Sequence, residues 1–279
     1  MIRWFIIFIL LSGCGGGSAS NCEIQNIVLQ NEAIEVHLST AGGSLSHVST
    51  IGGQNLINNQ DLGRQIQQSF YAGEDQVYPD QHPAWTPWPW NIIQTGDVYG
   101  NKAPMTVQFQ SDTRAVIMST PMRWDRNNEP EYCATLINDI TLINSMVRVH
   151  VSLVLSYECE IVNPIPHHQE MPAVYTAGNL DVLISGDNEI KNDKSIIWAY
   201  WEEPENWAGA YGSDGQGIAV YMDQAELFVG GRYENGMDHT TYFAPLKTLT
   251  LKPGDTLNYT YWIIVGTVQD IKDFIRSIQ

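Results

Sequence analysis

Basic residues are scarce in this chain. Only 14 of its 279 residues are Lys or Arg, against 31 Asp or Glu, and the formal net charge is −17 at pH 7. A chain this acidic repels the phosphate backbone of nucleic acids and anionic lipid headgroups. We therefore exclude nucleic acid as a partner and attribute most of the acidity to solubility.

Several motifs that carry chemistry in other proteins are missing as well. The sequence contains no C-x-x-C pair, no G-x-S-x-G, no P-loop, no H-E-x-x-H and no D-x-[DN]-x-[DN]-G loop. Their absence argues against a structural zinc site, a serine hydrolase, a nucleotide-binding protein, a zinc protease and an EF-hand. We expect no cofactor and no metal.

Cysteine is rare, with four residues in all: Cys14, Cys22, Cys133 and Cys159. Cys133 and Cys159 lie in consecutive strand-like segments that could be neighbours in a sheet, and an oxidising compartment would allow a disulfide. The sequence does not decide which cysteines pair.

Long apolar runs are absent from the N-terminal region. The run at 4–11 follows Arg3 and is too short to cross a bilayer. A positive start, a short apolar stretch and a small-residue cleavage site predict a signal peptide over residues 1–13. One alternative is an amphipathic end helix. Another is an ordinary secretory signal peptide, in which the cysteine at position 14 is incidental and carries no lipid.

The signal peptide ends in Leu-Ser-Gly followed by Cys14, which resembles the lipobox of bacterial lipoproteins. The resemblance implies cleavage before Cys14 and attachment of lipid to its thiol. Residues 14–21 are rich in Gly and Ser and predict a flexible tether. We therefore expect a lipid membrane as a partner through acylated Cys14, and a location in the bacterial cell envelope.

The rest of the chain has the pattern of an all-β protein. Residues 146–155 alternate apolar and polar side chains, as expected of a half-buried strand, and residues 269–278 place apolar residues on one helical face. We predict a large antiparallel β-sandwich with a short C-terminal helix, in one domain over residues 22–279. Long loops are expected at 71–100 and 198–212. Ten runs are predicted as strands: 24–29, 33–38, 105–110, 115–120, 137–143, 146–155, 180–184, 217–221, 246–251 and 257–265.

The first candidate site segment, 58–71, gathers amides, an arginine and a tyrosine. Amides and a guanidinium suit sugar hydroxyls, and Arg64 suits a carboxylate held by two hydrogen bonds. We select Arg64, Gln65, Gln67 and Tyr71. The alternative is a polar outer strand face on which Arg64 pairs with Asp61.

The second segment holds three tryptophans separated by prolines, at 85–90. Flat indoles can stack on the C–H faces of sugar rings. The alternative is that these tryptophans fill a core beneath a long loop. The binding candidates are Trp88, Trp90, Asn91 and Gln94, with Asp97 as a candidate carboxylate.

The third segment contains His168 and Glu170. On a strand they would share one face, and a histidine beside a carboxylate can do acid–base work. A metal is disfavoured because the spacing matches no established ligand motif. Trp124 and Trp207 are weaker candidates, since they are aromatics close to carboxylates.

Several of these blocks resemble galactose mutarotase-like domains. The Gly-Gly-Ser-Leu turn at 42–45 and the Gly-Gln-Asn-Leu-Ile segment at 53–57 are similar to the opening of that superfamily. The blocks at 61–71, 88–97 and 168–175 resemble a group of bacterial secreted proteins associated with it and with polysaccharide use. The resemblance implies the supersandwich fold, which also occurs in polysaccharide lyases and in accessory domains of glycosidases.

The resemblance also bears on the reaction. Mutarotases use a His and a Glu from distant strands as acid and base on the anomeric oxygen, whereas His168 and Glu170 sit in one motif, so mutarotase activity is disfavoured. We expect an exported lipoprotein that binds and processes a glycan ligand. The alternatives are a non-catalytic carbohydrate-binding lipoprotein and a structural envelope protein.

Two reactions are weighed for the glycan. In a lyase, Arg64 would neutralise a uronate carboxylate while His168 or Tyr71 removes the neighbouring proton. In a glycosidase, Asp97 and Glu170 would flank the scissile bond at about 5–10 Å.

Overall fold

The computed structural model describes residues 27–71, 81–83, 91–159, 166–186, 188–190, 199–235 and 238–278. Cys14, Cys22, Trp88 and Trp90 lie outside these ranges, as do the predicted signal peptide and tether. Within the described ranges, no helix has both the length and the apolar character needed to cross a membrane.

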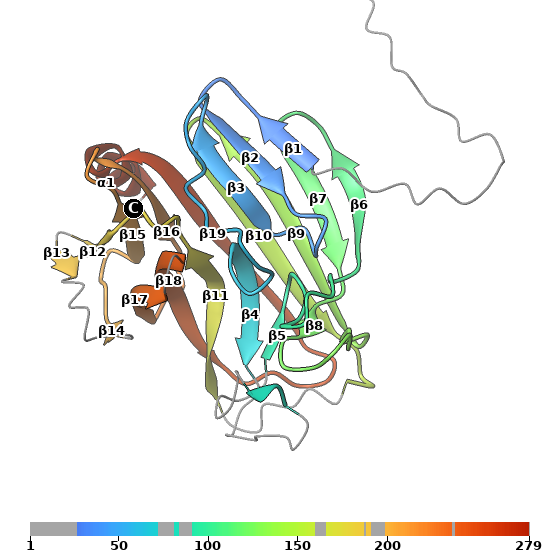
Figure 1. The fold of residues 1–279 in the computed structure, drawn as a ribbon. Coiled ribbons are helices and arrows are strands. Elements are labelled where there is room, and N and C mark those ends of the chain that lie inside the picture. The colour runs from blue at the N-terminus through green and yellow to red at the C-terminus, as the bar shows by residue number, and fades with distance from the viewer. Residues whose placement is uncertain are drawn as a thin grey trace, which may run out of the picture.

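Two antiparallel sheets lie face to face (Figure 1). The first sheet runs in the order β1 (Ile27–Gln30), β2 (Ile34–Leu38), β3 (Leu45–Thr50), β4 (Ile66–Tyr71), β11 (His167–Tyr175), β18 (Asp238–Leu249), β17 (Leu227–Asn235) and β14 (Ala199–Trp201). Off this path, β5 (Asn91–Ile93) pairs with β4, and β8 (Met122–Arg123) pairs with β5.

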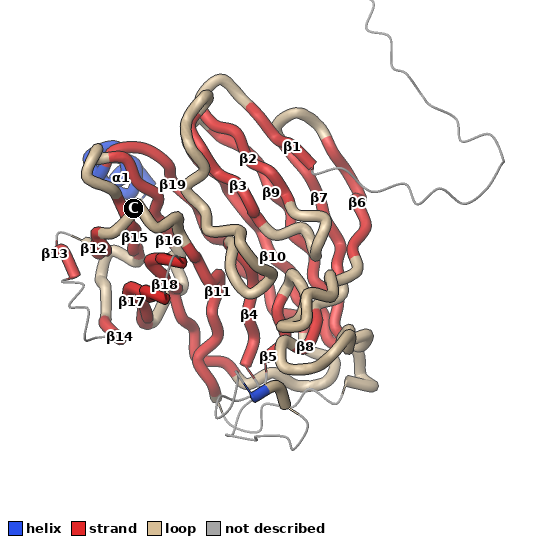
Figure 2. The backbone as a smooth tube through the Cα atoms, in the orientation of Figure 1, coloured by secondary structure: helices blue, strands red, loops and turns tan. Residues whose placement is uncertain are grey.

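The second sheet runs in the order β13 (Asn188–Ile190), β12 (Val182–Ser185), β15 (Trp207–Tyr211), β16 (Gln216–Tyr221), β19 (Thr256–Thr267), β10 (Met146–Leu155), β9 (Ala134–Ile143), β7 (Arg114–Ser119) and β6 (Met105–Gln110). Figure 2 shows how strands dominate the described chain. The predicted all-β sandwich is therefore confirmed.

The main core lies between the two sheets and follows from side-chain alternation. In β10, Val147, Val149, Val151 and Leu153 are fully buried, whereas the intervening His150 is exposed. They pack with apolar side chains from the inner faces of both sheets. All ten predicted strand runs overlap an observed strand.

The prediction of a long loop over 198–212 was wrong, because β14 and β15 lie in this stretch. Strand β17 also lies outside the predicted runs. Glycines weaken the period-2 pattern in both β15 and β17, with Gly209 in the former and Gly230 and Gly231 in the latter.

A polar link crosses the core between the sheets. Tyr259 donates a hydrogen bond to Oε1 of Gln68 (2.5 Å), and Nε2 of Gln68 donates to the hydroxyl of Tyr261 (3.1 Å). All three side chains are buried, and burial raises the pKa of both tyrosines. A buried amide is tolerated when its hydrogen bonds are made, and here one amide ties β4 to β19.

Helix α1 (Val268–Ile278) confirms the predicted C-terminal helix. Thr267 caps it, because its Oγ1 accepts a hydrogen bond from the amide of Asp270 while the Asp270 carboxylate accepts from the amide of Thr267. Ile271 and Ile275 pack with Trp207 on the outer face of the second sheet.

Cys133 and Cys159 form a disulfide bond, one of the pairings that the sequence left open. Cys133 directly precedes β9, and Cys159 follows β10, the strand paired with β9. The bond therefore closes the open end of this hairpin.

The turn between β2 and β3 contains two glycines with left-handed backbones, Gly42 (φ 65°) and Gly43 (φ 74°). Nε2 of Gln94 donates to the carbonyl of Gly42 (2.9 Å), and a Cβ on Gly42 would lie 1.8 Å from the carbonyl oxygen of Gln94. Gln94 is itself buried, so its role is to hold this turn.

This close approach predicts a large cost for Gly42→Ala. Gly52 makes a matched control, because it also has a positive φ (71°) but a Cβ there would meet no atom within 4 Å. Gly52→Ala should lower the free energy of unfolding by about 1–2 kcal/mol through backbone strain alone. Gly42→Ala adds a backbone clash and should lose clearly more, as urea denaturation would measure. Equal losses in the two variants would contradict the packing described for Gly42.

Candidate functional site

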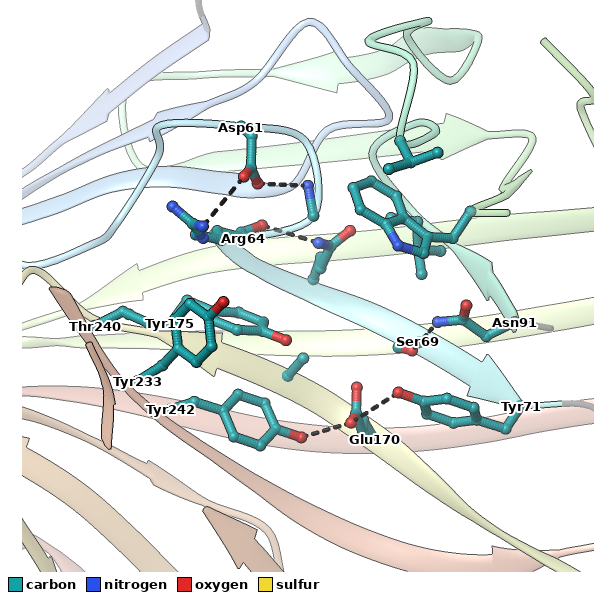
Figure 3. Close-up of a pocket in the computed structure, with 16 residues that line it drawn as sticks. Asp61, Arg64, Ser69, Tyr71, Asn91, Glu170, Tyr175, Tyr233, Thr240 and Tyr242 are labelled. Carbon is teal, nitrogen blue, oxygen red and sulfur yellow. Dashed lines mark hydrogen bonds and ion pairs between the residues drawn. The ribbon is translucent and has the colours of Figure 1, made fainter. Parts of the chain in front are cut away.

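A pocket of about 340 Å³ opens on the outer face of the first sheet (Figure 3). This volume lies in the range of small-molecule sites, about 300–1,000 Å³. Strands β4, β5, β11, β17 and β18 contribute to it, together with the loop that precedes β4. Its lining includes Asp61, Arg64, Gln67, Ser69, Tyr71, Asn91, Trp124, Glu170, Tyr175, Tyr233, Thr240 and Tyr242.

Strand alternation explains which side chains of β4 reach the pocket. Ile66, Gln68 and Phe70 are buried, Ile66 and Phe70 in the core and Gln68 against the tyrosines of β19. The other set, Gln67, Ser69 and Tyr71, therefore lines the pocket. The same alternation in β18 directs Thr240 and Tyr242 to the pocket.

Strand β11 contains an irregularity that shapes the site. Its register with β4 shifts by one residue between Glu170, which pairs with Ser69, and Ala173, which pairs with Gln67. A bulge of this kind changes which face the following residues occupy. As a result Glu170, Ala173 and Tyr175 all line the pocket, although strict alternation would separate Glu170 from Tyr175.

Glu170 is the centre of the pocket's hydrogen bonding. Its Oε1 accepts hydrogen bonds from the hydroxyls of Tyr242 (2.5 Å) and Tyr71 (3.2 Å), as Figure 3 shows. Burial raises the pKa of the Glu170 carboxyl, while the hydrogen bonds from Tyr242, Tyr71 and Ser69 lower it and offset part of that rise. The carboxyl therefore takes up a proton more readily than an exposed glutamate.

The two tyrosines are held as proton donors. Burial, followed by the nearby Glu170 charge, raises the pKa of Tyr71 and Tyr242 well above 10. A phenolate is thus disfavoured at both positions, and each hydroxyl stays available to stabilise an ionised Glu170.

Arg64 reaches the pocket from a tightly held loop. Its guanidinium lies 3.5 Å from the carboxylate of Asp61, and the other oxygen of Asp61 accepts a hydrogen bond from the amide of Gly63 (2.9 Å). Gly63 packs against the indole of Trp124, where a Cβ would lie 2.6 Å from the ring. Gln67 completes the support by donating from Nε2 to the carbonyls of Leu62 and Arg64.

Aromatic rings form much of the wall. Tyr175 lies against Tyr242 with ring centroids 4.8 Å apart, and Figure 3 shows Tyr233 beside them. Burial and the charges of Glu170 and Asp61 raise the pKa of Tyr175, while Arg64 lowers it. Flat rings with polar groups at their edges suit a sugar, which has apolar C–H faces and a rim of hydroxyls.

Asn91 adds an unsatisfied acceptor. Its Nδ2 donates to Oγ of Ser69 (2.9 Å), whereas its buried Oδ1 has no hydrogen-bond partner among the described residues. A ligand hydroxyl is a suitable partner for such an oxygen.

Six residues predicted from the sequence come together in this pocket: Arg64, Gln67, Tyr71, Asn91, Trp124 and Glu170. The expected pairing of Arg64 with Asp61 is present too, and both side chains line the pocket. This segment therefore contains the expected ion pair and also contributes to the pocket lining.

The structure places Asp97 and His168 elsewhere. The Asp97 carboxylate is buried and accepts four hydrogen bonds, from the amides of Tyr99, Asn101 and Asn128 and the side chain of Asn101. His168 is exposed, and its Nδ1 lies 3.0 Å from Oγ1 of Thr248. Neither lines the pocket, so the expected Asp97–Glu170 and His168–Glu170 pairs are not assembled there.

Gln65, Gln94 and Trp207 also lie outside the pocket lining and make contacts within the protein. Oε1 of Gln65 accepts a hydrogen bond from Ser44, and its backbone has a positive φ (83°). Gln94 holds the Gly42 turn, as described above. Trp207 is fully buried beneath helix α1, and its indole donates to Glu205 (2.9 Å).

The sequence reasoning missed the partners that come from distant strands. Tyr242 and Thr240 lie about seventy residues beyond Glu170, and only the pairing of β11 with β18 brings them together. Ser69 could have been found, because it alternates with Gln67 and Tyr71. Among the described residues, no group of three metal-ligating side chains lies in the pocket.

No protein-family model matches the sequence, and no curated protein matches it either. Solved structures do match. A galactose mutarotase related enzyme from Lactobacillus acidophilus has a TM-score of 0.57 at 10% identity, over 87% of this chain and 97% of that one. A galactose mutarotase-like protein from Lactobacillus casei has a TM-score of 0.57 at 11% identity, over 86% and 99%.

A third match is a putative aldose 1-epimerase from Escherichia coli K12, with a TM-score of 0.55 at 10% identity, over 87% of this chain and 99% of that one. Identities this low establish similarity of fold. The fold implied by the resemblance in sequence is confirmed: the chain folds as a β-sandwich similar to those of galactose mutarotase-like proteins.

Proposed function

We propose that this protein binds a sugar unit of a glycan in the pocket and that Glu170 transfers a proton during the processing of that glycan. One observation carries the proposal. A partly buried carboxyl with a raised pKa lies in an aromatic pocket and accepts hydrogen bonds from two tyrosine hydroxyls. Perturbed carboxyls in such pockets are typical of acid–base catalysts. The matching structures named for mutarotase and aldose epimerase support a sugar as the ligand.

Of the reactions considered, the geometry favours β-elimination from a uronate-containing glycan. Arg64 supplies a cation for the uronate carboxylate, and Glu170 supplies a base whose raised pKa lies closer to neutrality. Glu170 takes the proton beside the carboxylate, and the electron pair of the broken C–H bond forms the new C=C bond. The bond to the glycosidic oxygen breaks, and the protonated Glu170 passes its proton to the departing oxygen. Tyr71 and Tyr242 stay protonated throughout and stabilise the carboxylate form of Glu170 by their hydrogen bonds. The Asp97–Glu170 hydrolase pair is disfavoured, because Asp97 is committed to its own turn.

We further propose that the protein is exported and anchored through lipid on Cys14. The support is the short apolar run, the Leu-Ser-Gly-Cys motif and the Gly/Ser segment that follows. None of the other three cysteines, Cys22, Cys133 and Cys159, follows a Leu-Ser-Gly motif.

The anchor is tested with Cys14→Ser in a bacterial host. The parent chain should incorporate labelled fatty acid and sediment with membranes, whereas Cys14→Ser should do neither, because the thiol that carries the lipid is gone. Cys22→Ser is the matched control and should behave as the parent does. Labelled lipid on Cys14→Ser would contradict the proposal.

The reaction is tested by incubating the full chain with neutral and uronate-containing polysaccharides. We expect new ultraviolet absorbance from an unsaturated product, and Glu170→Gln should slow its appearance by about 10²–10⁴-fold. His150→Ala is a suitable control, because His150 is exposed on β10 of the other sheet. Reducing ends without absorbance would indicate hydrolysis. Binding of the polysaccharide without turnover would favour a non-catalytic module. Loss of activity in His168→Ala but not in Glu170→Gln would reject Glu170 as the proton-transferring group.

The raised pKa of Glu170 also predicts a pH-dependent stability. The folded state holds the proton more tightly than the unfolded chain, whose glutamate titrates near 4.5. The free energy of unfolding therefore falls as the pH rises from about 4.5 through the folded-state pKa. Glu170→Gln cannot ionise, so its stability relative to the parent should grow over that interval. Urea denaturation from about pH 4 to pH 8 would measure this, and a constant difference would contradict the raised pKa.

A further inference from the structure

A second polar cluster lies on the outer face of the first sheet, away from the pocket residues. Glu35 and His37 belong to β2, and His47 belongs to β3. His37 and His47 are directly opposite in the strand register, and Glu35 is two residues from His37 on the same face. The intervening Ile34, Val36 and Leu38 are fully buried in the core, so the cluster faces outward.

The ligand atoms of this cluster converge. Nε2 of His37 lies 2.8 Å from Oε1 of Glu35, and Nε2 of His47 lies 4.0 Å from the same oxygen. The two imidazole rings are stacked, with centroids 4.3 Å apart and planes inclined by 17°. One ligand atom from each residue lies within 4.8 Å of the other two. The side chains keep 21–32% of their surface exposed, which leaves solvent access.

We propose that Glu35, His37 and His47 bind a divalent transition metal ion, with Zn²⁺ as the representative. In a tetrahedral zinc site with bonds of about 2.0–2.1 Å, ligand atoms are roughly 3.3 Å apart. The two Nε2–Oε1 separations of 2.8 and 4.0 Å bracket this value. Because the two rings are stacked, zinc binding requires the imidazoles to rotate until a nitrogen of each points at the same ion. Two imidazoles and one carboxylate are a ligand set that zinc accepts, and they leave a fourth position for water or a substrate atom.

The way strands β2 and β3 are held favours a metal site over a chance contact between surface side chains. Both strands are anchored by core residues, and paired strands hold side-chain positions more rigidly than loops do. Ser49 lies next along the same face, and its hydroxyl is 2.9 Å from Nε2 of His47, so zinc binding at this nitrogen would replace that contact. Nitrogen ligands disfavour Ca²⁺ and Mg²⁺, which prefer oxygen, and this sets the metal class.

The test is calorimetric titration of ZnCl₂ into the full chain, with Cys14→Ser and Cys22→Ser introduced to remove thiols outside the disulfide. We expect one zinc ion per chain. His37→Ala and His47→Ala should each weaken zinc binding by at least about tenfold. Removing a residue that merely hydrogen-bonds to a metal ligand already costs about that much, and these variants remove a ligand itself. Glu35→Gln should also weaken it, because a neutral amide is a poorer ligand.

His150→Ala is the matched control. His150 is also an exposed strand histidine, but its ring bonds Thr260 and it belongs to no cluster of three metal ligands among the described residues. It should bind zinc as the parent does. A higher thermal midpoint with Zn²⁺, absent in His37→Ala, gives a second readout. The proposal is overturned if the parent binds no zinc, or if the His37→Ala, His47→Ala double variant binds it equally well while retaining its metal-free thermal midpoint.

Discussion

The pocket depends on how strand β4 is held in the core. Gln68 is fixed between Tyr259 and Tyr261 of the opposite sheet, and Ile66 and Phe70 pack around it. Because side chains alternate along a strand, fixing this inner set also fixes Gln67, Ser69 and Tyr71 on the outer face. A shift of β4 by one residue would exchange the two sets. The buried amide resists such a shift, since an unpaired Gln68 in the core would cost about 1–3 kcal/mol.

The site itself places a carboxyl where ionisation is unfavourable. Burial penalises the charged form of Glu170, and hydrogen bonds from Tyr242 and Tyr71 offset only part of that penalty. Those tyrosines are themselves prevented from ionising, so proton exchange in this group centres on Glu170. This is the arrangement expected of a group that must both give and accept a proton, because its two protonation states are brought closer in free energy near neutral pH.

Sequence patterns predicted the fold where alternation is regular. Strands β9 and β10 and helix α1 have clean periodicity, whereas the glycines of β15 and β17 hide theirs. Within the site, Arg64, Tyr71 and Glu170 were predictable because polar residues are dense there. Asp97, Gln65 and Gln94 come from equally polar segments but lie outside the pocket lining and bond to other parts of the protein. A polar side chain can serve a ligand or the protein itself, and sequence does not distinguish these uses. Tyr242 required knowledge of the β11–β18 pairing.

The two sheets differ in what their outer faces can offer. On the second sheet, helix α1 covers Trp207, Tyr221 and Ile264, so that part of the face is packed against the protein itself. On the first sheet, β2 and β3 carry Glu35, His37 and His47 outward, and β4, β11 and β18 carry the pocket. Each outward residue lies next to a buried one, so its position is set by the core rather than by a loop. Chemistry on this protein is therefore expected on the outer face of the first sheet, where polar side chains are both accessible and rigidly placed.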